Sequence, residues 1–518
     1  MKEPLILTID FGTQSVRVAL FNKKGETIAL EKQRYSPAYF STKPGYAEQN
    51  PDYYFECMCK CSLALRAKNP AFMNDIVGVS MTCFRDTAVL LDKQMKVIRP
   101  SILWLDQRQA EAKEKMPLLS RAAFRLVGMT DTIVLNRKRT VAHWIKENEP
   151  EVWSKVHKYV SISTYFTFLL TEQLKDSPSN QAGHYPIDFK NRAWYKSDKS
   201  IKGQIFGISH DKLCELIPVG EIIASISKKA SELTGMPYGL PLFSVGSDKS
   251  CETLGTGVLN EDVGSISYGT ASTIEVTTKK YHDSEKFLPS YPACIPNYYN
   301  MDVQIYRGYW MLNWFVDQFA GGESIESAIE KAVILEEMNK KMMSISPGSD
   351  GLVLQPYWGP GLRRPLAKGA IIGFSDVHTK EHLYRAIVEG IAYALRDALE
   401  GFEKTLHHKI TSLMISGGGS QSDAICQITA DIFGLPVSRV QTYETSSLGA
   451  AIAGFLAAKV FASPEEAIKS MVQKTDTFIP NIQIHQRYDY LFHNAYQQMY
   501  PELKTIYRKI KEYNSIEF

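Results

Sequence analysis

A short phrase that occurs twice constrains the fold of this chain more than any other feature of its sequence. The first copy, residues 9–15, reads IDFGTQS, and the second, residues 266–272, reads ISYGTAS. Runs rich in β-branched residues flank both copies, which is the pattern of a strand, a tight turn and a returning strand. Such a turn offers backbone N–H groups and small hydroxyls to an anion. The two hairpins therefore predict a nucleotide held between two related domains.

Chain length and net charge limit the number of domains and the kinds of partner that this sequence can have. A chain of 518 residues favours two or more domains. The net charge of +3, without a long basic run, gives no electrostatic support for a nucleic acid partner. No apolar run approaches the roughly 18–20 residues that cross a bilayer, so no membrane association is expected. The N-terminus enters a strand directly and does not read as a signal peptide, so we expect a cytoplasmic protein.

The eight cysteines are expected to be reduced thiols, as in most cytosolic proteins. Cys57, Cys59 and Cys61 form a cluster that could suggest a metal site. Their spacing does not match zinc pairs and no histidine lies nearby, so we interpret them as residues of a helix.

Strands alternate with helices in both halves, which predicts α/β domains over residues 1–254 and 255–518, with a crossing near residues 254–257. In the first half we expect strands within 5–35, at 76–84, 86–92 and 242–248, a helix at 51–67, and mainly helices over 107–170. The second half repeats the plan, with a hairpin at 263–278, a strand before Gly417, and helices at 308–320, 379–405 and 421–434.

Asp10 is the candidate metal ligand. Mg²⁺ prefers a carboxylate together with water and substrate phosphates, and the second hairpin has Ser267 at the same place, so a single Mg²⁺ site is expected. Arg17 could reach a phosphate or pair with an acid. The alternative is a plain hairpin with a solvated aspartate.

Asp248 is the candidate catalytic base. It follows an apolar strand beside a glycine-rich crossing, where open α/β sheets place their ligands. Phosphoryl transfer to an alcohol needs a group that accepts the hydroxyl proton, and a positioned carboxylate suffices. The alternative role is to cap the following helix.

Arg85 and Asp86 interrupt an otherwise apolar strand pair, where charges are costly unless they bind something polar. A sugar or polyol would accept from the guanidinium and donate to the carboxylate, and Trp104 could stack on the apolar face of a sugar. The alternatives are a structural ion pair and core packing.

Gly417, Gly418 and Gly419 lie between a strand and a helix, where a ligand can approach the backbone and a helix N-terminus favours anions. Ser422, in the first turn that follows, could line a nucleotide.

Taken together, these motifs resemble the FGGY carbohydrate kinases, relatives of actin and hexokinase. The N-terminal D-x-G-T-x-S is residues 10–15, the W-x-x-E-N segment is residues 144–148, the strand-end G-x-D is residues 246–248, and the C-terminal G-x-x-x-G is residues 369–373. The resemblance implies two RNase-H-like domains (the actin/hexokinase type) with ATP and sugar in the cleft between them. It implies Asp248 as the base, Asp10 as the Mg²⁺-linked acid and Gly417–Gly419 as the loop near the adenosine. The implied phosphate contacts are Thr13, Gln14, Arg17, Gly269 and Thr270.

The substrate stays open at this point. Arg85-Asp86 is similar to the Arg-Glu pair of glycerol kinases and autoinducer-2 kinases, and residues 176–183 resemble a segment of the latter. Lys249 and Thr273 depart from the glycerol kinases, and the Met-His pair of xylulokinases is absent. We expect an ATP-dependent kinase of a small sugar or polyol; the alternatives are phosphorylation of an autoinducer-2-type signalling molecule and a non-catalytic actin-like nucleotide sensor. Homodimers are frequent in the family, so the resemblance implies a homodimer as the candidate assembly.

Overall fold

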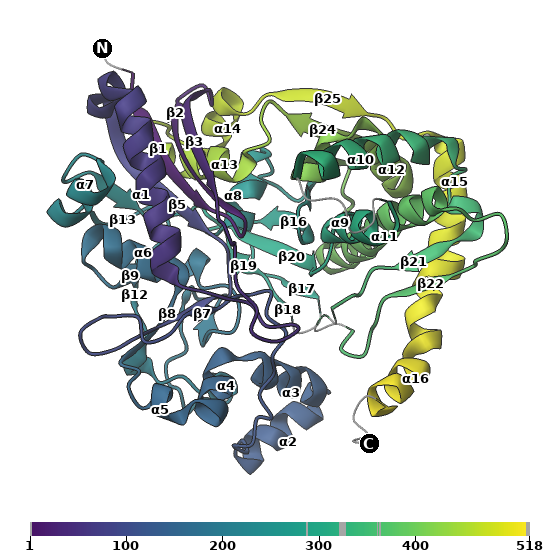
Figure 1. The fold of residues 1–518 in the computed structure, drawn as a ribbon, viewed down its shortest axis with the longest axis horizontal. Coiled ribbons are helices and arrows are strands. Elements are labelled where there is room, and N and C mark those ends of the chain that lie inside the picture. Colours follow the sequence, from purple (N-terminus) through teal and green to yellow (C-terminus); the bar gives the residue numbers. More distant parts are fainter. Residues whose placement is uncertain (1–2, 286–287, 321–327, 360, 362–363, 514–518) are drawn as a thin grey trace.

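The computed structural model describes residues 3–285, 288–320, 328–359, 361 and 364–513; the outer ends of both expected domains, residues 1–2 and 514–518, lie outside the described residues. Two mixed β-sheets lie side by side, and each carries one of the two Gly-Thr hairpins. Helices pack against both sheets (Figure 1). The predicted α/β class is confirmed.

The first sheet has the strand order β13-β14-β5-β1-β2-β3. Its strands are β1 (Leu5–Phe11), β2 (Ser15–Asn22), β3 (Thr27–Arg34), β5 (Ile76–Cys83), β13 (Ile222–Ser225) and β14 (Pro241–Phe243). The first three strands form an antiparallel meander, while β5 and β14 continue the sheet in parallel with β1. All seven residues of β1 are buried, since this strand lies between the helices that cover the two faces.

The second sheet has the order β19-β20-β16-β15-β23-β24-β25. Its strands are β15 (Val263–Tyr268), β16 (Ser272–Thr278), β19 (Tyr291–Pro292), β20 (Tyr299–Ile305), β23 (Ser412–Ser416), β24 (Val437–Val440) and β25 (Lys474–Phe478). Here too a meander, β15-β16-β20, is followed by parallel strands β23 and β24. The repeated plan read from the sequence is therefore present in the structure.

Long helices cover the sheets where the sequence predicts them. α1 (Pro51–Lys68) begins after Asn50, whose side chain accepts a hydrogen bond from the Asp52 backbone. α11 (Lys380–Leu406) begins at a capping box formed by Thr379 and His382, and most of it is buried. Cys57, Cys59 and Cys61 lie on α1, as predicted, and all eight cysteines are free.

Two helices join the sheets. α8 (Asp248–Gly255) packs along α13 (Thr445–Ala457), and α13 also packs on β1 and β5 of the first sheet although it follows the second sheet in sequence. A Cβ on Gly255 would lie 1.9 Å from the Thr445 carbonyl oxygen, and one on Gly449 would lie 1.7 Å from that of Cys251. Only glycine permits this approach. The expected boundary at residue 254 falls inside the last turn of α8 and stays a prediction.

The predicted helical stretch 107–170 is correct only in part. It contains α2 (Leu118–Leu126), α3 (Thr130–Arg139), α4 (Val141–Asn148), α5 (Pro150–Trp153) and α6 (Ile162–Thr171), but β8 (Lys158–Ser161) interrupts the series by pairing with β6 (Ala88–Leu91). Partner strands distant in sequence decide such short strands, which a helical pattern does not reveal. No helix in the described part of the chain is long and apolar enough to span a membrane.

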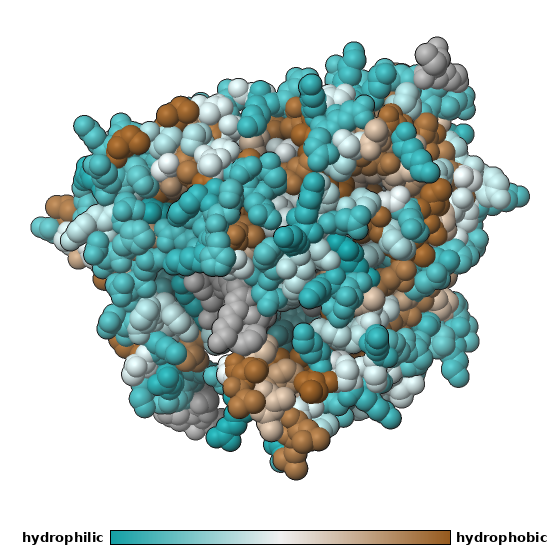
Figure 2. Space-filling model, turned by 180° about the vertical axis from the view of Figure 1, so that it is seen from behind, coloured by the Kyte–Doolittle hydropathy of each residue, from teal (hydrophilic) through white to brown (hydrophobic). Residues whose placement is uncertain are grey.

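α2 leaves apolar side chains on the surface. Leu118, Leu119 and Leu126 are 75%, 84% and 89% exposed, and Figure 2 shows apolar side chains gathered at the lower edge of the molecule, where α2 and α3 lie. Among the described residues, Met116, Phe124, Ile133 and Ile205 form a small separate core beneath this face, with Met129 and Phe206 packed against it.

Candidate active site

A cavity of about 560 Å³ contains most of the side chains predicted to act together. Segments from both sheets and from the α8–α13 pair line it. The predicted residues in its lining are Asp10, Thr13, Gln14, Arg17, Arg85, Asp86, Trp104, Asp248, Gly269, Thr270, Gly417 and Gly418. Gly419 and Ser422 lie outside the lining.

The first hairpin turns tightly, with the Gly12 N–H donating to the Ser15 carbonyl oxygen at 3.0 Å. Asp10 and Arg17 are register partners on β1 and β2, and their side chains are 3.4 Å apart. Burial raises the pKa of Asp10 to about 6, an effect that Arg17 opposes and that Glu444, Asp248 and Glu252 strengthen. A buried carboxylate among three further acids is an environment that favours a cation.

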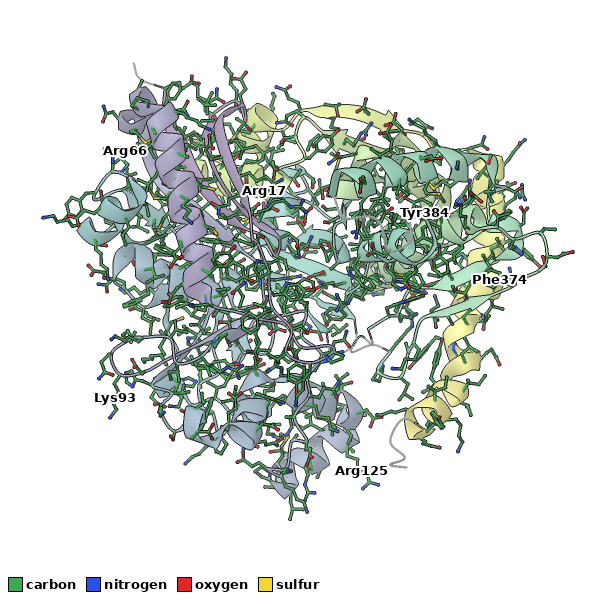
Figure 3. All side chains as sticks on the ribbon, viewed as in Figure 1. Arg17, Arg66, Lys93, Arg125, Phe374 and Tyr384 are labelled. Carbon is green, nitrogen blue, oxygen red and sulfur yellow. The ribbon has the colours of Figure 1, made fainter. Side chains whose placement is uncertain are left out.

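Glu444 completes the charge arrangement of this hairpin. It pairs with Arg17 and lies 3.3 Å from the Lys32 ammonium group. Figure 3 shows Arg17 toward the middle of the molecule, on the hairpin strands. Arg17 therefore pairs with an acid from each half of the chain, which is one of the two roles expected for it, and its contact with a phosphate stays a prediction.

The second hairpin has a different polar environment. The Lys249 ammonium group donates to the Ser267 hydroxyl at 2.8 Å, and that hydroxyl donates to the Glu252 carboxylate at 2.8 Å. Lys249 and Glu252 are also paired directly at 2.7 Å. Burial raises the pKa of Glu252. Lys249 and hydroxyl donors that include Ser416 together lower this pKa by more than burial raises it, so the net shift is downward.

Asp248 lines the same cavity as the two hairpins. The expected strand 242–248 ends at Phe243, and Asp248 is the first residue of α8 rather than the end of a strand or the helix cap. Small polar residues such as Ser247 favour a helix start here. Burial raises the pKa of Asp248, while Lys249 and Arg85 oppose the shift. The result is a half-buried carboxylate with an increased affinity for a proton.

Arg85 and Asp86 do not pair with each other. Arg85 lies 2.7 Å from Asp302 and packs over the Tyr291 ring at 5.2 Å. Asp86 accepts from the His184 backbone at 2.8 Å, and its other oxygen is 2.7 Å from the imidazole Nδ1. Although burial raises the pKa of Asp86, His184 lowers it, and the net shift is downward. Each predicted substrate residue is thus fixed by a partner from elsewhere in the chain.

Trp104 lines the cavity beside the first hairpin. Its indole N–H donates to the Thr13 hydroxyl at 3.0 Å. The residue predicted for sugar stacking thereby touches one predicted for phosphate.

The glycine-rich turn leaves the second sheet at β23. Gly417 has φ of +80°, and a Cβ there would lie 2.8 Å from the Tyr268 backbone, so this position needs glycine. Gly419 lies against Tyr309, and Ser422 caps α12 (Asp423–Phe433) by accepting from the Ile425 N–H. A nucleotide role for Gly419 and Ser422 stays a prediction.

Sequence reasoning missed several residues of this lining, among them Glu252, His184, Tyr291, Asp302 and Glu444. Glu444 precedes the small-residue helix α13 and had a local signal in its motif. Asp302 lies within a strand and had none, because only the register of β20 against β16 brings it to the cavity.

Comparison with solved structures defines the class of fold. The gluconate kinase of Lactobacillus acidophilus superposes with a TM-score of 0.80 at 22% identity, covering 98% of this chain and 100% of that one. The ligand-bound xylulose kinase of the same organism also gives 0.80, at 21% identity, with the same coverage. Both likenesses show the two-domain actin/hexokinase-like fold.

Sequence comparison defines the family. Residues 5–255 match the N-terminal domain of the FGGY family of carbohydrate kinases, and residues 264–458 match its C-terminal domain. The xylulose kinase of Lactococcus lactis is 30% identical over 98% of this chain and 99% of its own length. The gluconokinase of Bacillus subtilis is 28% identical over 92% and 91%. This chain belongs to the FGGY family and is a sugar kinase, a phosphotransferase acting on a sugar hydroxyl, and such kinases use ATP as phosphate donor.

Proposed function

We propose that this kinase transfers the γ-phosphate of ATP to a hydroxyl of a neutral ketose or polyol, with Asp248 as the general base. The observation that carries the proposal is the position of Asp248, half-buried in the lining of a cavity to which both hairpins contribute. A proton affinity raised by burial brings a carboxylate closer to the operating pH, which suits a group that takes up a hydroxyl proton.

The pairing of the cations supports a neutral substrate. Among the described residues that line the cavity, the lysines and arginines are Arg17, Lys32, Arg85 and Lys249, and each has a carboxylate partner. A sugar acid would need a cation for its carboxylate, and taking Arg85 or Lys249 would leave a buried acid unpaired. Hydroxyls can instead donate to Asp86 and accept from Arg85 without breaking a pair.

We further propose that Mg²⁺ accompanies ATP at Asp10. No group of three or more metal-binding side chains occurs among the described residues, which suits a metal held mainly by phosphates and water. Mg²⁺ would neutralise phosphate charge, while Asp10 would orient it and the two hairpins would offer their N–H groups to the phosphates. The raised pKa of Asp10 fits this role, because a carboxylate in an acid-rich site gains from a cation.

The test is coupled ADP release with Mg-ATP, using wild type, Asp248→Asn and, as a control, Asp211→Asn, which changes an exposed aspartate outside the cavity lining. The sugar panel contains xylulose, ribulose, erythritol, glycerol, gluconate and the autoinducer dihydroxypentanedione. We expect a neutral sugar or polyol to be preferred and Asp248→Asn to lose on the order of 10²–10⁴ in rate.

A near-normal rate for Asp248→Asn would remove the base assignment. Preference for gluconate would contradict the neutral substrate, and preference for dihydroxypentanedione would favour the signalling-molecule alternative. ATP binding without turnover on any member would favour the sensor.

A further inference from the structure

A second cavity, of about 420 Å³, lies in the helical subdomain of α2–α5 and the loop that follows residue 197. Its volume is in the range of small-ligand sites. Two acids line it, Glu114 and Asp198, against five cations: Lys115, Arg137, Lys146, Lys199 and Lys212. The formal charge of the lining is therefore 5 − 2 = +3. In the catalytic cavity, by contrast, the lysines and arginines of the described lining are paired with acids.

Arg137 is the most buried of these cations, at 6% exposure. Its guanidinium donates to two backbone carbonyls, those of Gln204 at 3.2 Å and of Glu114. Within the described residues no carboxylate lies at ion-pair distance from it, and burial lowers its pKa although Glu114 and Glu147 oppose the shift at longer range. The Glu147 carboxylate already accepts the backbone N–H groups of residues 111 and 113. A buried arginine without a paired acid is uncommon in proteins.

Lys146 and Lys212 repeat this arrangement. Their ammonium groups donate to the carbonyls of Gly207 at 2.7 Å and Val156 at 2.5 Å, again without an acid partner in the described structure. Both lie over the Trp153 ring, at 5.0 and 5.8 Å from its centre. Burial lowers the pKa of Lys146, and Arg137 and Lys212 lower it further through repulsion, while Glu114 opposes the shift. Each ammonium keeps donors beyond its one carbonyl bond.

We propose that this cavity binds a phosphoryl dianion, as free phosphate or as a small phosphate ester. Two negative charges suit a lining of net +3 better than the single charge of a carboxylate does, and Lys146 and Lys212 hold donors for its oxygens. Neighbouring residues of α3 serve the two cavities, since Asn136 lines the catalytic one and Arg137 lines this one. The site is thus separate from the catalytic cavity and shares one helix with it.

The test is calorimetric titration of inorganic phosphate at constant ionic strength into wild type and a Lys146→Gln/Lys212→Gln double variant. The catalytic cavity is unchanged in the variant, so any phosphate binding there is common to both proteins. We expect wild type to bind phosphate at one site in addition to any in the catalytic cavity. The double variant should bind phosphate at this site at least about ten-fold more weakly, because it lacks the charge-assisted hydrogen bonds. Lys155→Gln, which changes an exposed lysine outside the lining, should match wild type.

If the double variant fails to fold, Lys115→Gln/Lys199→Gln serves instead, because both side chains are exposed at the rim, and several-fold weaker binding is expected. The proposal is overturned if wild type shows no additional site, or if Lys155→Gln weakens binding as much as the variants do. A parallel titration with ribose 5-phosphate distinguishes the sources: tighter binding than phosphate assigns an ester, and equal binding assigns free phosphate. Neither titration depends on the catalytic proposal.

Discussion

The two Gly-Thr hairpins share a backbone plan and differ in their charges. At corresponding register positions the first pairs Asp10 with Arg17, and the second pairs Ser267 with Thr273. The first hairpin carries its own acid and cation. The second hairpin carries a hydroxyl, and the acid and cation that contact it, Glu252 and Lys249, come from α8. A Gly-Thr turn therefore joins two antiparallel strands in each half, although the turn is one residue longer in the first hairpin, and only the first hairpin carries a carboxylate at this register position.

The largest expected loss of stability follows substitution of Lys249, the α8 residue that contacts the second hairpin. Lys249→Met removes the cation from Glu252 and leaves a buried acid with hydroxyl donors only. Loss of one partner of a buried pair costs about 3–5 kcal/mol of stability. Thermal or urea unfolding should show this loss, whereas Lys229→Met, an exposed site on α7 (Lys228–Thr234), should stay near wild type.

A Lys249→Met/Glu252→Gln double variant tests the cause of this loss. Because it also removes the unpaired charge of Glu252, it should recover part of the stability that Lys249→Met loses. No recovery would mean that the ion pair is not the source of the destabilisation.

The next effect concerns the pH dependence that only the first hairpin should show. The folded pKa of Asp10 is about 6 against an ordinary 3.8, so the native state holds this proton more tightly than the unfolded chain does. Its contribution to stability is therefore present at low pH and is lost as pH rises from about 4 to about 6. The loss is roughly 3 kcal/mol at 1.36 kcal/mol per pKa unit.

The measurement compares unfolding of wild type and Asp10→Asn, without nucleotide, at pH 5 and pH 7.5. The variant should gain on wild type as pH rises, and Ser267→Ala should show no such trend. Parallel pH profiles for wild type and Asp10→Asn would contradict the buried, proton-retaining Asp10.

A smaller effect is expected from Ser267→Ala. The hydroxyl links Lys249 to Glu252, and its loss leaves the direct 2.7 Å pair intact. Removal of one partner of buried hydrogen bonds costs about 1–3 kcal/mol. The midpoint of urea unfolding tests this, with Ser267→Thr expected to retain much of the stability. A loss as large as that of Lys249→Met would mean that the hydroxyl, not the ion pair, holds Glu252.

The smallest effect is expected at Glu444, which is only partly buried. Glu444→Gln weakens the contacts with Arg17 and Lys32, and a partly exposed pair contributes about 0–1 kcal/mol. Because Glu444 raises the pKa of Asp10, the variant should lower the pH at which the Asp10 contribution is lost. Glu31→Gln is the control, since Glu31 pairs with Lys68 outside the cavity lining. If the Glu444→Gln variant lost the Asp10 contribution at the same pH as wild type, Glu444 would not influence the pKa of Asp10.

The sequence by itself determined the features that depend on neighbours along the chain. The two hairpins follow from Gly-Thr turns between β-branched runs, α1 follows from its cap and apolar spacing, and the motif set indicates the family. Most of the predicted site residues line one cavity for the same reason, because their motifs lie at strand ends and turns that face it.

Only the tertiary structure decided which partner each charged side chain has. Arg85 could have paired with Asp86 and instead pairs with Asp302, more than two hundred residues away, and Arg17 pairs with Glu444 from the second half. The contact of α8 with α13 at Gly255 and Gly449 is likewise set by packing between the sheets. Pairing of buried charges depends on distances of a few ångströms between distant segments, and local sequence preferences do not contain those distances.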